Sequence, residues 1–96
     1  MTIEETATFT EIDILENGTK IGFAEVSGEE LVQFKIYEPF QGQGFGSMAL
    51  EQILQKYDIK KINVMAENQK AIHLYEKHGF YINDLNMFEM RNAYDT

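Results

Sequence analysis

The stretch that decides the fold reads Gln41-Gly42-Gln43-Gly44-Phe45-Gly46-Ser47. Its three glycines stand at every second position, just before a segment whose apolar residues recur at helical spacing, residues 47–57. Glycine lets the backbone approach a ligand closely, and a helix that begins here leaves its first N–H groups free. Such groups favour an anion, most often a phosphate. The alternative is a flexible turn that only changes the direction of the chain.

Two common phosphate-binding motifs fit the stretch poorly. A Walker loop needs a lysine after its last glycine, and none follows Gly46. A dinucleotide fingerprint would place an acidic residue about 20 positions further on, where Glu67 stands. However, Ser47 replaces the third glycine of that fingerprint, and residues 38–41 separate the glycines from the preceding strand.

Upstream of the glycines, the sequence predicts an antiparallel meander of three strands at residues 7–15, 20–26 and 31–37. Asn17-Gly18 favours a tight hairpin turn between the first two, because both residues tolerate positive φ. Alternation in the third strand places on one face Val32, Phe34 and Ile36.

Downstream, helix 47–57 is followed by a strand at residues 60–66, which we expect to lie parallel to strand 31–37. A second helix begins after Asn68 as its N-cap and stops at Gly79. Two further strands are expected at residues 80–82 and 87–90. The order β-β-β-α-β-α-β-β predicts an α+β fold with a mixed, mostly antiparallel twisted sheet and two helices.

Composition limits the classes of function. The 96 residues suit a single domain, 1–96, and 44% hydrophobic content supports a packed core. The absence of cysteine excludes disulfides, thiolate metal sites and a cysteine nucleophile, and His73 and His78 are spaced poorly for a metal, so no metal is expected. A net charge of −8 opposes nucleic acid and attracts cationic amines. Without a membrane-length apolar stretch or a signal-peptide pattern, we expect no membrane contact and a cytoplasmic protein.

Two motifs together resemble the GNAT acetyltransferases. Gln41-x-x-Gly44-x-Gly46 matches the signature Q/R-x-x-G-x-G/A of that family. Residues 68–80 are similar to a second signature, N-x-x-A-x-x-x-Y-x-x-x-G-F. The two stand in the expected order, separated by a predicted helix and strand, and the resemblance extends over about residues 7–90.

The resemblance implies acetyl-CoA as co-substrate. Backbone N–H groups of residues 41–47 would hold its pyrophosphate, and its pantetheine arm would lie along the third strand where that strand splays from residues 62–66. The N–H near Ile36 would stabilise the oxyanion. The implied cofactor-binding set is Phe34, Lys35, Ile36, Gln41, Gly42, Gln43, Gly44, Phe45, Gly46, Ser47, Asn68 and Tyr75.

Two residues are candidates for catalysis. Tyr75 matches the tyrosine that donates a proton to the departing thiolate, although a tyrosine on a helix face can also serve packing alone. Glu30 falls in the register of a general base, against the alternative of a solvated turn carboxylate. The implied function is acetyl transfer from acetyl-CoA directly to a primary amine of a small molecule or peptide. A non-catalytic acyl-CoA-binding module or subunit and a dinucleotide-binding fragment remain alternatives.

The resemblance also implies a departure from the family. Most members carry a strand and two helices before the first hairpin, and these build one wall of the acceptor site. This sequence begins almost at the hairpin. We therefore expect the acceptor site to be open or to be completed by a second subunit in a homodimer.

Overall fold

One sheet runs through the protein, whose computed structural model describes residues 1–7, 10–65, 67–84 and 89–92. Within these ranges the strands are β1 (Thr2–Glu5), β2 (Glu11–Glu16), β3 (Thr19–Ser27), β4 (Glu30–Ile36), β5 (Lys61–Asn63), β6 (Phe80–Asp84) and β7 (Glu89–Asn92). The helices are α1 (Phe45–Lys56), α2 (Gln69–Lys77) and the short 3-10 helix η1 (Glu38–Phe40).

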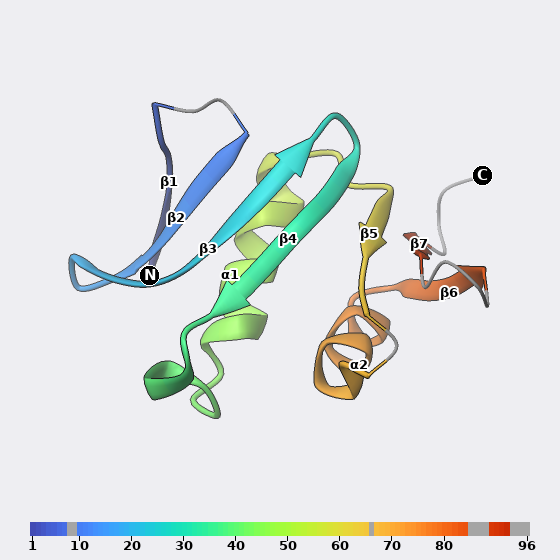
Figure 1. Ribbon diagram of the computed structural model, residues 1–96. Coiled ribbons are helices and arrows are strands. Elements are labelled where there is room, and N and C mark those ends of the chain that lie inside the picture. Colours follow the sequence, from blue (N-terminus) through green and yellow to red (C-terminus); the bar gives the residue numbers. More distant parts are fainter. Residues whose placement is uncertain (8–9, 66, 85–88, 93–96) are drawn as a thin grey trace.

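The strands follow the order β1-β2-β3-β4-β5-β7-β6 across the sheet. Neighbours are antiparallel except β4 and β5, the parallel pair that the crossover through α1 predicts. In Figure 1, α1 lies behind β3 and β4, β1 and β2 stand to the left, and no described helix lies in front of these four strands. The expected α+β class and mostly antiparallel sheet are confirmed, with one strand more than expected.

The core lies between the sheet and the two helices. Its larger cluster joins strand residues such as Ile12, Ala24 and Ile62 to Leu50 of α1 and Ile72 of α2. A smaller cluster is formed by Ile14, Ile21, Ile36 and Ala49. Both helices therefore bury their apolar faces against the same sheet, which fixes the ends of α1 and α2 beside the last residues of β4.

Local signals in the sequence placed the turns and caps correctly. Asn17 and Gly18 have φ values of 51° and 80°, as the predicted hairpin turn requires. The Asn68 side chain accepts a hydrogen bond from the Ala71 N–H at 3.2 Å, and Gly79 ends α2 with φ 91°. The positions of this turn and of these caps are determined by residues only a few positions apart, so the sequence alone indicates them.

Several predicted bounds were wrong. The strand expected over residues 7–15 begins only at Glu11, and that expected over 60–66 is limited to Lys61–Asn63, with residue 66 outside the described ranges. The helix expected from Ser47 starts at Phe45. The strand expected over residues 80–82 continues to Asp84 as β6, and residues 85–88 lie outside the described ranges.

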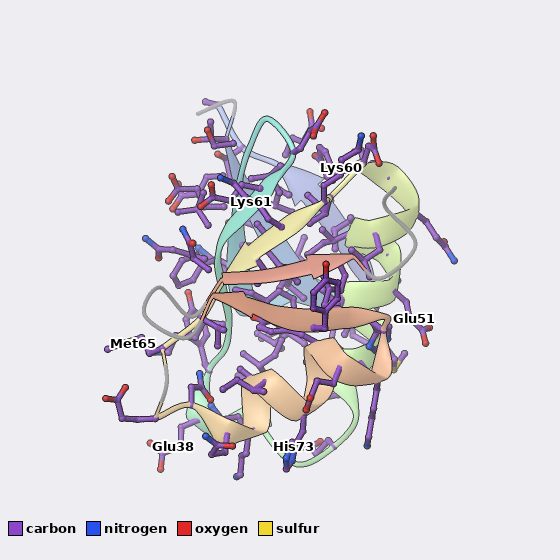
Figure 2. All side chains as sticks on the ribbon, turned by 90° about the vertical axis from the view of Figure 1, so that its right-hand side faces the viewer. Glu38, Glu51, Lys60, Lys61, Met65 and His73 are labelled. Atoms are coloured by element: carbon purple, nitrogen blue, oxygen red, sulfur yellow. The ribbon has the colours of Figure 1, made fainter. Side chains whose placement is uncertain are left out.

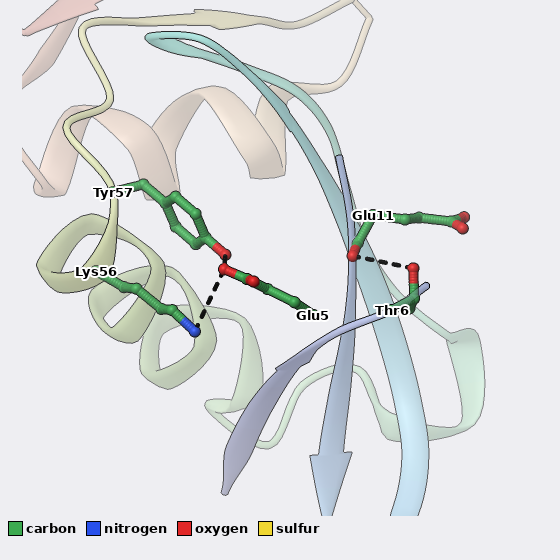
Figure 3. Close-up of polar contacts among 5 residues, drawn as sticks. All are labelled: Glu5, Thr6, Glu11, Lys56 and Tyr57. Atoms are coloured by element: carbon green, nitrogen blue, oxygen red, sulfur yellow. Dashed lines mark hydrogen bonds and ion pairs between the residues drawn. The ribbon is translucent and has the colours of Figure 1, made fainter. Parts of the chain in front are cut away.

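The strand β1 was not expected from the sequence. It pairs with β2 from Thr2↔Leu15 to Glu5↔Ile12. The Glu5 carboxylate accepts a hydrogen bond from the Tyr57 hydroxyl and lies 3.5 Å from the Lys56 Nζ, so β1 is attached to the end of α1 (Figure 3). Thr6 Oγ1 also donates to the Glu11 carbonyl at 3.3 Å.

The position of β1 corrects the expectation that an N-terminal strand is missing. A strand does occupy this edge of the sheet. Residues 6–10 join it to β2, at the point where the resemblance implies two helices. The front of the sheet in Figure 1 is therefore not covered by helices from this connection.

Candidate functional site

The glycine loop leads directly into α1. Gly42 and Gly44 have φ values of 77° and 84°, in the left-handed region that favours glycine, and Gly44 is the N-cap of α1. A Cβ on either residue would meet no atom within 4 Å. Their backbone conformation therefore requires glycine, while the space beside them is open to a ligand.

The first turn of α1 presents free donors. The first intrahelical bond of α1 joins the Met48 N–H to the Gly44 carbonyl at 3.2 Å. The N–H groups of Phe45, Gly46 and Ser47 come before it and have no partner within the helix. No side chain caps this end of the helix. Together with the dipole of α1, these donors make a suitable environment for a phosphate.

A β-bulge in β4 lies near the start of that strand, at the opposite end from the glycine loop. On β3, Glu25 pairs with Gln33 and Val26 pairs with Leu31, so Val32 has no partner. The bulge also corrects the predicted face of this strand, because it places Leu31 in the core and leaves Val32 half-buried. An extra residue bends a strand and increases its twist.

The strands β4 and β5 separate at the bulge. Their pairing consists of Glu30↔Lys61 and Leu31↔Ile62, and it ends just before Val32. Figure 1 shows the two strands adjacent at one end and apart at the other. The splay expected beside Phe34 and Ile36 is therefore present, and it leaves one edge of β4 without a strand partner.

Two cavities open along this unpaired edge. The loop cavity, of about 590 Å³, lies between the end of β4, the glycine loop and α2, and its lining includes Gln41, Gly42, Gly46, Lys70 and Leu74. The tyrosine cavity, of about 430 Å³, is lined by residues that include Phe23, Asn63, Met65 and Tyr75. The two meet at shared lining residues: Phe34, Lys35 and Asn68. A long ligand could thus run from the glycine loop to Tyr75.

Part of the rim of the tyrosine cavity is apolar, beside the polar lining residues Gln33, Lys35, Asn63 and Asn68. Met65 is 74% exposed and extends from the edge of the molecule in Figure 2. Phe23, on the uncovered front of the sheet, lines the same cavity and contacts the ring of Tyr37, with a centroid distance of 6.3 Å. The cavity therefore reaches the face that no described helix covers.

Tyr75 is both packed and placed at the cavity. It is only 3% exposed, and its ring meets that of Phe34 edge-on, with centroids 6.4 Å apart. Burial raises the pKa of its hydroxyl to about 12. The hydroxyl therefore stays protonated at neutral pH and could act as a proton donor. The packing and cavity interpretations of this residue are compatible.

Glu30 does not reach the cavities. Its carboxylate lies 3.4 Å from the Lys61 Nζ and accepts a hydrogen bond from the Asn63 side-chain amide. It lines neither cavity, and no described Asp, Glu or His does so. The structure therefore does not bring the candidate base together with Tyr75.

Gly22 is a site-supporting residue that the sequence analysis missed. A Cβ there would lie 2.1 Å from the Lys35 carbonyl oxygen, so the side chain of any other residue would push β3 away from β4. Gly22 pairs with Ile36, at the splayed end of β4. The available signal was an isolated glycine inside a strand pattern, which often marks close backbone approach.

Comparison with known proteins agrees with this architecture. A model of the GNAT acetyltransferase domain matches residues 9–82. The chain belongs to the GNAT family. An uncharacterized N-acetyltransferase of Bacillus subtilis (strain 168), YycN, is 37% identical to this GNAT domain over 62 residues, which cover 59% of the chain and 40% of YycN.

Solved structures share the fold. PH1933 from Pyrococcus horikoshii OT3 superposes with a TM-score of 0.70 at 22% identity, covering 90% of this chain and 66% of that one. A GNAT family acetyltransferase from Elizabethkingia anophelis, with acetyl-CoA bound, gives 0.63 at 26% identity and covers 77% and 55%. This GNAT domain thus spans less than two thirds of the length of each of these relatives.

The described helices are 3, 12 and 9 residues long. Within the described ranges, none is long and apolar enough to cross a bilayer.

Proposed function

We propose that the chain binds acetyl-CoA and transfers the acetyl group directly to a primary amine. The observation that supports this most strongly is the separation of β4 from β5, which opens an unpaired strand edge between the glycine loop and Tyr75. An extended ligand that carries amides can hydrogen-bond to such an edge as a strand would. Family membership supports the same chemistry.

The residues present suit acetyl-CoA. The free N–H groups at the start of α1 and the open space at Gly42 and Gly44 suit its pyrophosphate. Lys70, which lines the loop cavity, adds positive charge beside that position. The backbone of residues 34–36 suits the pantetheine arm, and Asn68 lies where the two cavities meet. The thioester would then lie at the tyrosine cavity.

The transfer makes one bond and breaks one. The neutral amine nitrogen forms a bond to the thioester carbonyl carbon, and a backbone N–H on the unpaired edge of β4 stabilises the oxygen that becomes negative. The donor expected near Ile36 lines the loop cavity alone, whereas Phe34 lines the tyrosine cavity as well. The carbon–sulfur bond then breaks, and the sulfur takes the proton of the Tyr75 hydroxyl. The attacking nitrogen releases one proton to water, and water returns a proton to Tyr75. The products are the acetylated amine and free CoA.

The acceptor must reach the site as a neutral amine. No described carboxylate or imidazole lines the tyrosine cavity, and the charged residue on its wall is Lys35. A neighbouring cation and the apolar side chains of the cavity both favour the uncharged form of an amine. Activity should therefore rise with pH until the amine itself is deprotonated. The uncovered front of the sheet leaves room for small-molecule and peptide acceptors.

Mass spectrometry of an amine panel incubated with acetyl-CoA and the protein tests this function. We expect a mass gain of one acetyl group on at least one amine. Acetyl-CoA and CoA should also raise the melting temperature, whereas NAD should not. At 100 times its dissociation constant a ligand stabilises by about 2.7 kcal/mol. Stabilisation by acetyl-CoA without any acetylated amine would favour the non-catalytic binding module. Stabilisation by NAD alone would favour a dinucleotide site.

We further propose that the chain forms a homodimer. The front of the sheet carries the partly exposed rings of Phe23 and Tyr37, and β1 and β6 are the edge strands. A second copy could cover this face and complete the wall of the acceptor site. Sedimentation equilibrium at high micromolar concentration tests this, and a single species of 11.1 kDa would exclude it.

A further inference from the structure

The tyrosine cavity extends beyond the place that a thioester would take. It meets the loop cavity at residues that include Phe34, and it continues along β4 as far as Val32, with Asn63 on the β5 side. Val32 and Asn63 are the first residues after the last pair that joins β4 to β5. Because the two strands converge there, they bound the cavity at this point. We call this part the inner end, and it is formed by Val32, Asn63 and Val64.

The inner end presents mainly apolar groups. Val64 is half-buried and packs against the larger core cluster. Val32 is the extra residue of the bulge, and bulges beside active sites often re-aim a side chain. The Asn63 amide donates a hydrogen bond to the carboxylate of Glu30, which lines neither cavity. A ligand that reaches the inner end would therefore mainly contact the methyl groups of the two valines.

An acetyl group is too short to reach these methyl groups. A donor that follows the unpaired edge from the glycine loop passes Phe34 before Val32, and its thioester belongs beside Tyr75, whose ring meets that of Phe34. A strand rises about 3.4 Å per residue, so Val32 lies about 7 Å beyond Phe34 along β4. The acetyl methyl extends only one bond, about 1.5 Å, past the thioester carbonyl. A chain of about three to five carbons past the carbonyl would span the distance.

The amine can approach from another side. Phe23 pairs with Lys35 across β3 and β4, so their side chains share the front face of the sheet, and both line the tyrosine cavity. No described helix covers this face in Figure 1. A chain at the inner end and an amine arriving from the front would therefore occupy different parts of the cavity.

We propose that butyryl- and hexanoyl-CoA are donors for this site, with the acyl chain between Val32 and Val64, and that Val32 limits the length of that chain. This inference rests on the proposed transfer and names the class of donor. The amine nitrogen bonds to the acyl carbonyl carbon, the carbon–sulfur bond breaks, and the sulfur takes the Tyr75 proton. Water accepts the proton of the amine and returns one to Tyr75, which leaves the butyryl or hexanoyl amide and free CoA.

Calorimetric titration with CoA and with its acetyl, butyryl, hexanoyl and octanoyl thioesters tests the donor class. Each methylene that becomes buried should lower the dissociation constant about fourfold, so butyryl-CoA should bind at least about fourfold more tightly than acetyl-CoA. The gain should stop between hexanoyl and octanoyl. Mass spectrometry should show a butyryl amide on the amine that acetyl-CoA acetylates.

The possible results separate this inference from the proposed function. Equal or weaker binding of butyryl-CoA, or acetyl transfer without butyryl transfer, would overturn the inference and leave the proposed function standing. If neither CoA nor any of its thioesters binds, both are overturned.

Variants at the inner end test the role of Val32. Val32→Phe and Val64→Phe narrow the space from its two sides, so the ratio of the acetyl-CoA to the hexanoyl-CoA dissociation constant should fall to about one. Val32→Ala enlarges the space, so octanoyl-CoA should gain affinity relative to hexanoyl-CoA. Thr19→Phe is the control, because it adds the same ring at an exposed position of β3 outside both cavities and should keep the wild-type ratio. Thermal melting checks that each variant folds, and a wild-type ratio in a folded Val32→Phe would overturn the inference.

NMR locates the chain without any substitution. The sequence has three valines, and Val26 lines neither cavity. With hexanoyl-CoA labelled at its terminal methyl, nuclear Overhauser effects should connect that methyl with the methyl groups of Val32 and Val64, and none with those of Val26. Contacts of the acceptor amine with Val32 and Val64 in place of the acyl chain would assign the inner end to the acceptor and overturn the inference.

Discussion

The Tyr75 hydroxyl is a single group whose removal should separate chemistry from packing. Tyr75→Phe keeps the ring that contacts Phe34 and loses only the proton donor. Turnover should fall by about 10²-fold, within the usual range for a general acid, while affinity for acetyl-CoA stays near wild type. Steady-state kinetics and calorimetric titration measure the two quantities. Parallel losses of stability and affinity would show that the hydroxyl is structural.

Gly44 should tolerate no side chain, because of its φ of 84° and its place beside the open anion site. Gly44→Val should abolish binding of CoA compounds. Gly18 is a matched control, since it has φ 80°, lies in the β2–β3 hairpin, and also has no atom within 4 Å of a Cβ. Gly18→Val imposes similar backbone strain away from the site. Calorimetry should show binding only in the Gly18 variant, and equal loss in both would make the effect one of folding alone.

At the scale of elements, β1 depends on contacts from a distant helix. Tyr57→Phe removes the hydrogen bond to Glu5 and should lower the free energy of unfolding by about 0.5–1.5 kcal/mol. Tyr81→Phe alters a tyrosine that is 46% exposed and should be neutral. Urea unfolding of the two variants measures the difference. An unchanged free energy of unfolding in Tyr57→Phe would mean that pairing with β2 alone holds β1 in place.

This contact also explains which elements could be predicted from the sequence. The caps of α2 and the Asn17-Gly18 turn depend on neighbouring residues, so local sequence patterns indicate them. The strand β1 is short and acidic, and it is stabilised by β2 and by Tyr57, 52 positions away from Glu5. No local sequence pattern predicts a contact with a residue so far along the chain.

The candidate site likewise has features that the sequence indicates and features that depend on the folded structure. The glycine loop and Tyr75 could be singled out from the sequence because their residue types and spacing match the two family motifs, and the structure places both along the unpaired edge of β4. The bulge at Val32 was missed, since apolar side chains at both Leu31 and Val32 fit either register. The separation of Glu30 from the cavities depends on where Lys61 and Asn63 lie after folding, and the sequence does not place them.

At the scale of the whole molecule, two tyrosines with raised pKa values should make the free energy of unfolding decrease at alkaline pH. Burial first, and then Glu5, raises the pKa of Tyr57 to about 12, and burial raises the pKa of Tyr75 to about 12. An unfolded tyrosine loses its proton near pH 10. Between about pH 10 and 12 the unfolded chain therefore releases protons that the folded chain retains, so the free energy of unfolding should fall as pH rises. Urea unfolding at a series of pH values should show this slope, and it should become shallower in Tyr75→Phe.

Only two residue pairs join β4 to β5, so this junction is a weak seam between two parts of the sheet. We expect the two parts to behave as separate cooperative units of unfolding. On one side lie β1–β4, with long antiparallel ladders, and on the other lie β5–β7 with α2. Segments joined by few hydrogen bonds open locally at a lower free energy than the global one. Native-state hydrogen exchange should therefore find the amides of β5 opening before those of β3. If acetyl-CoA binds across this seam as proposed, it should reduce the difference in opening free energy between β5 and β3, so that the two sides unfold more nearly as one unit.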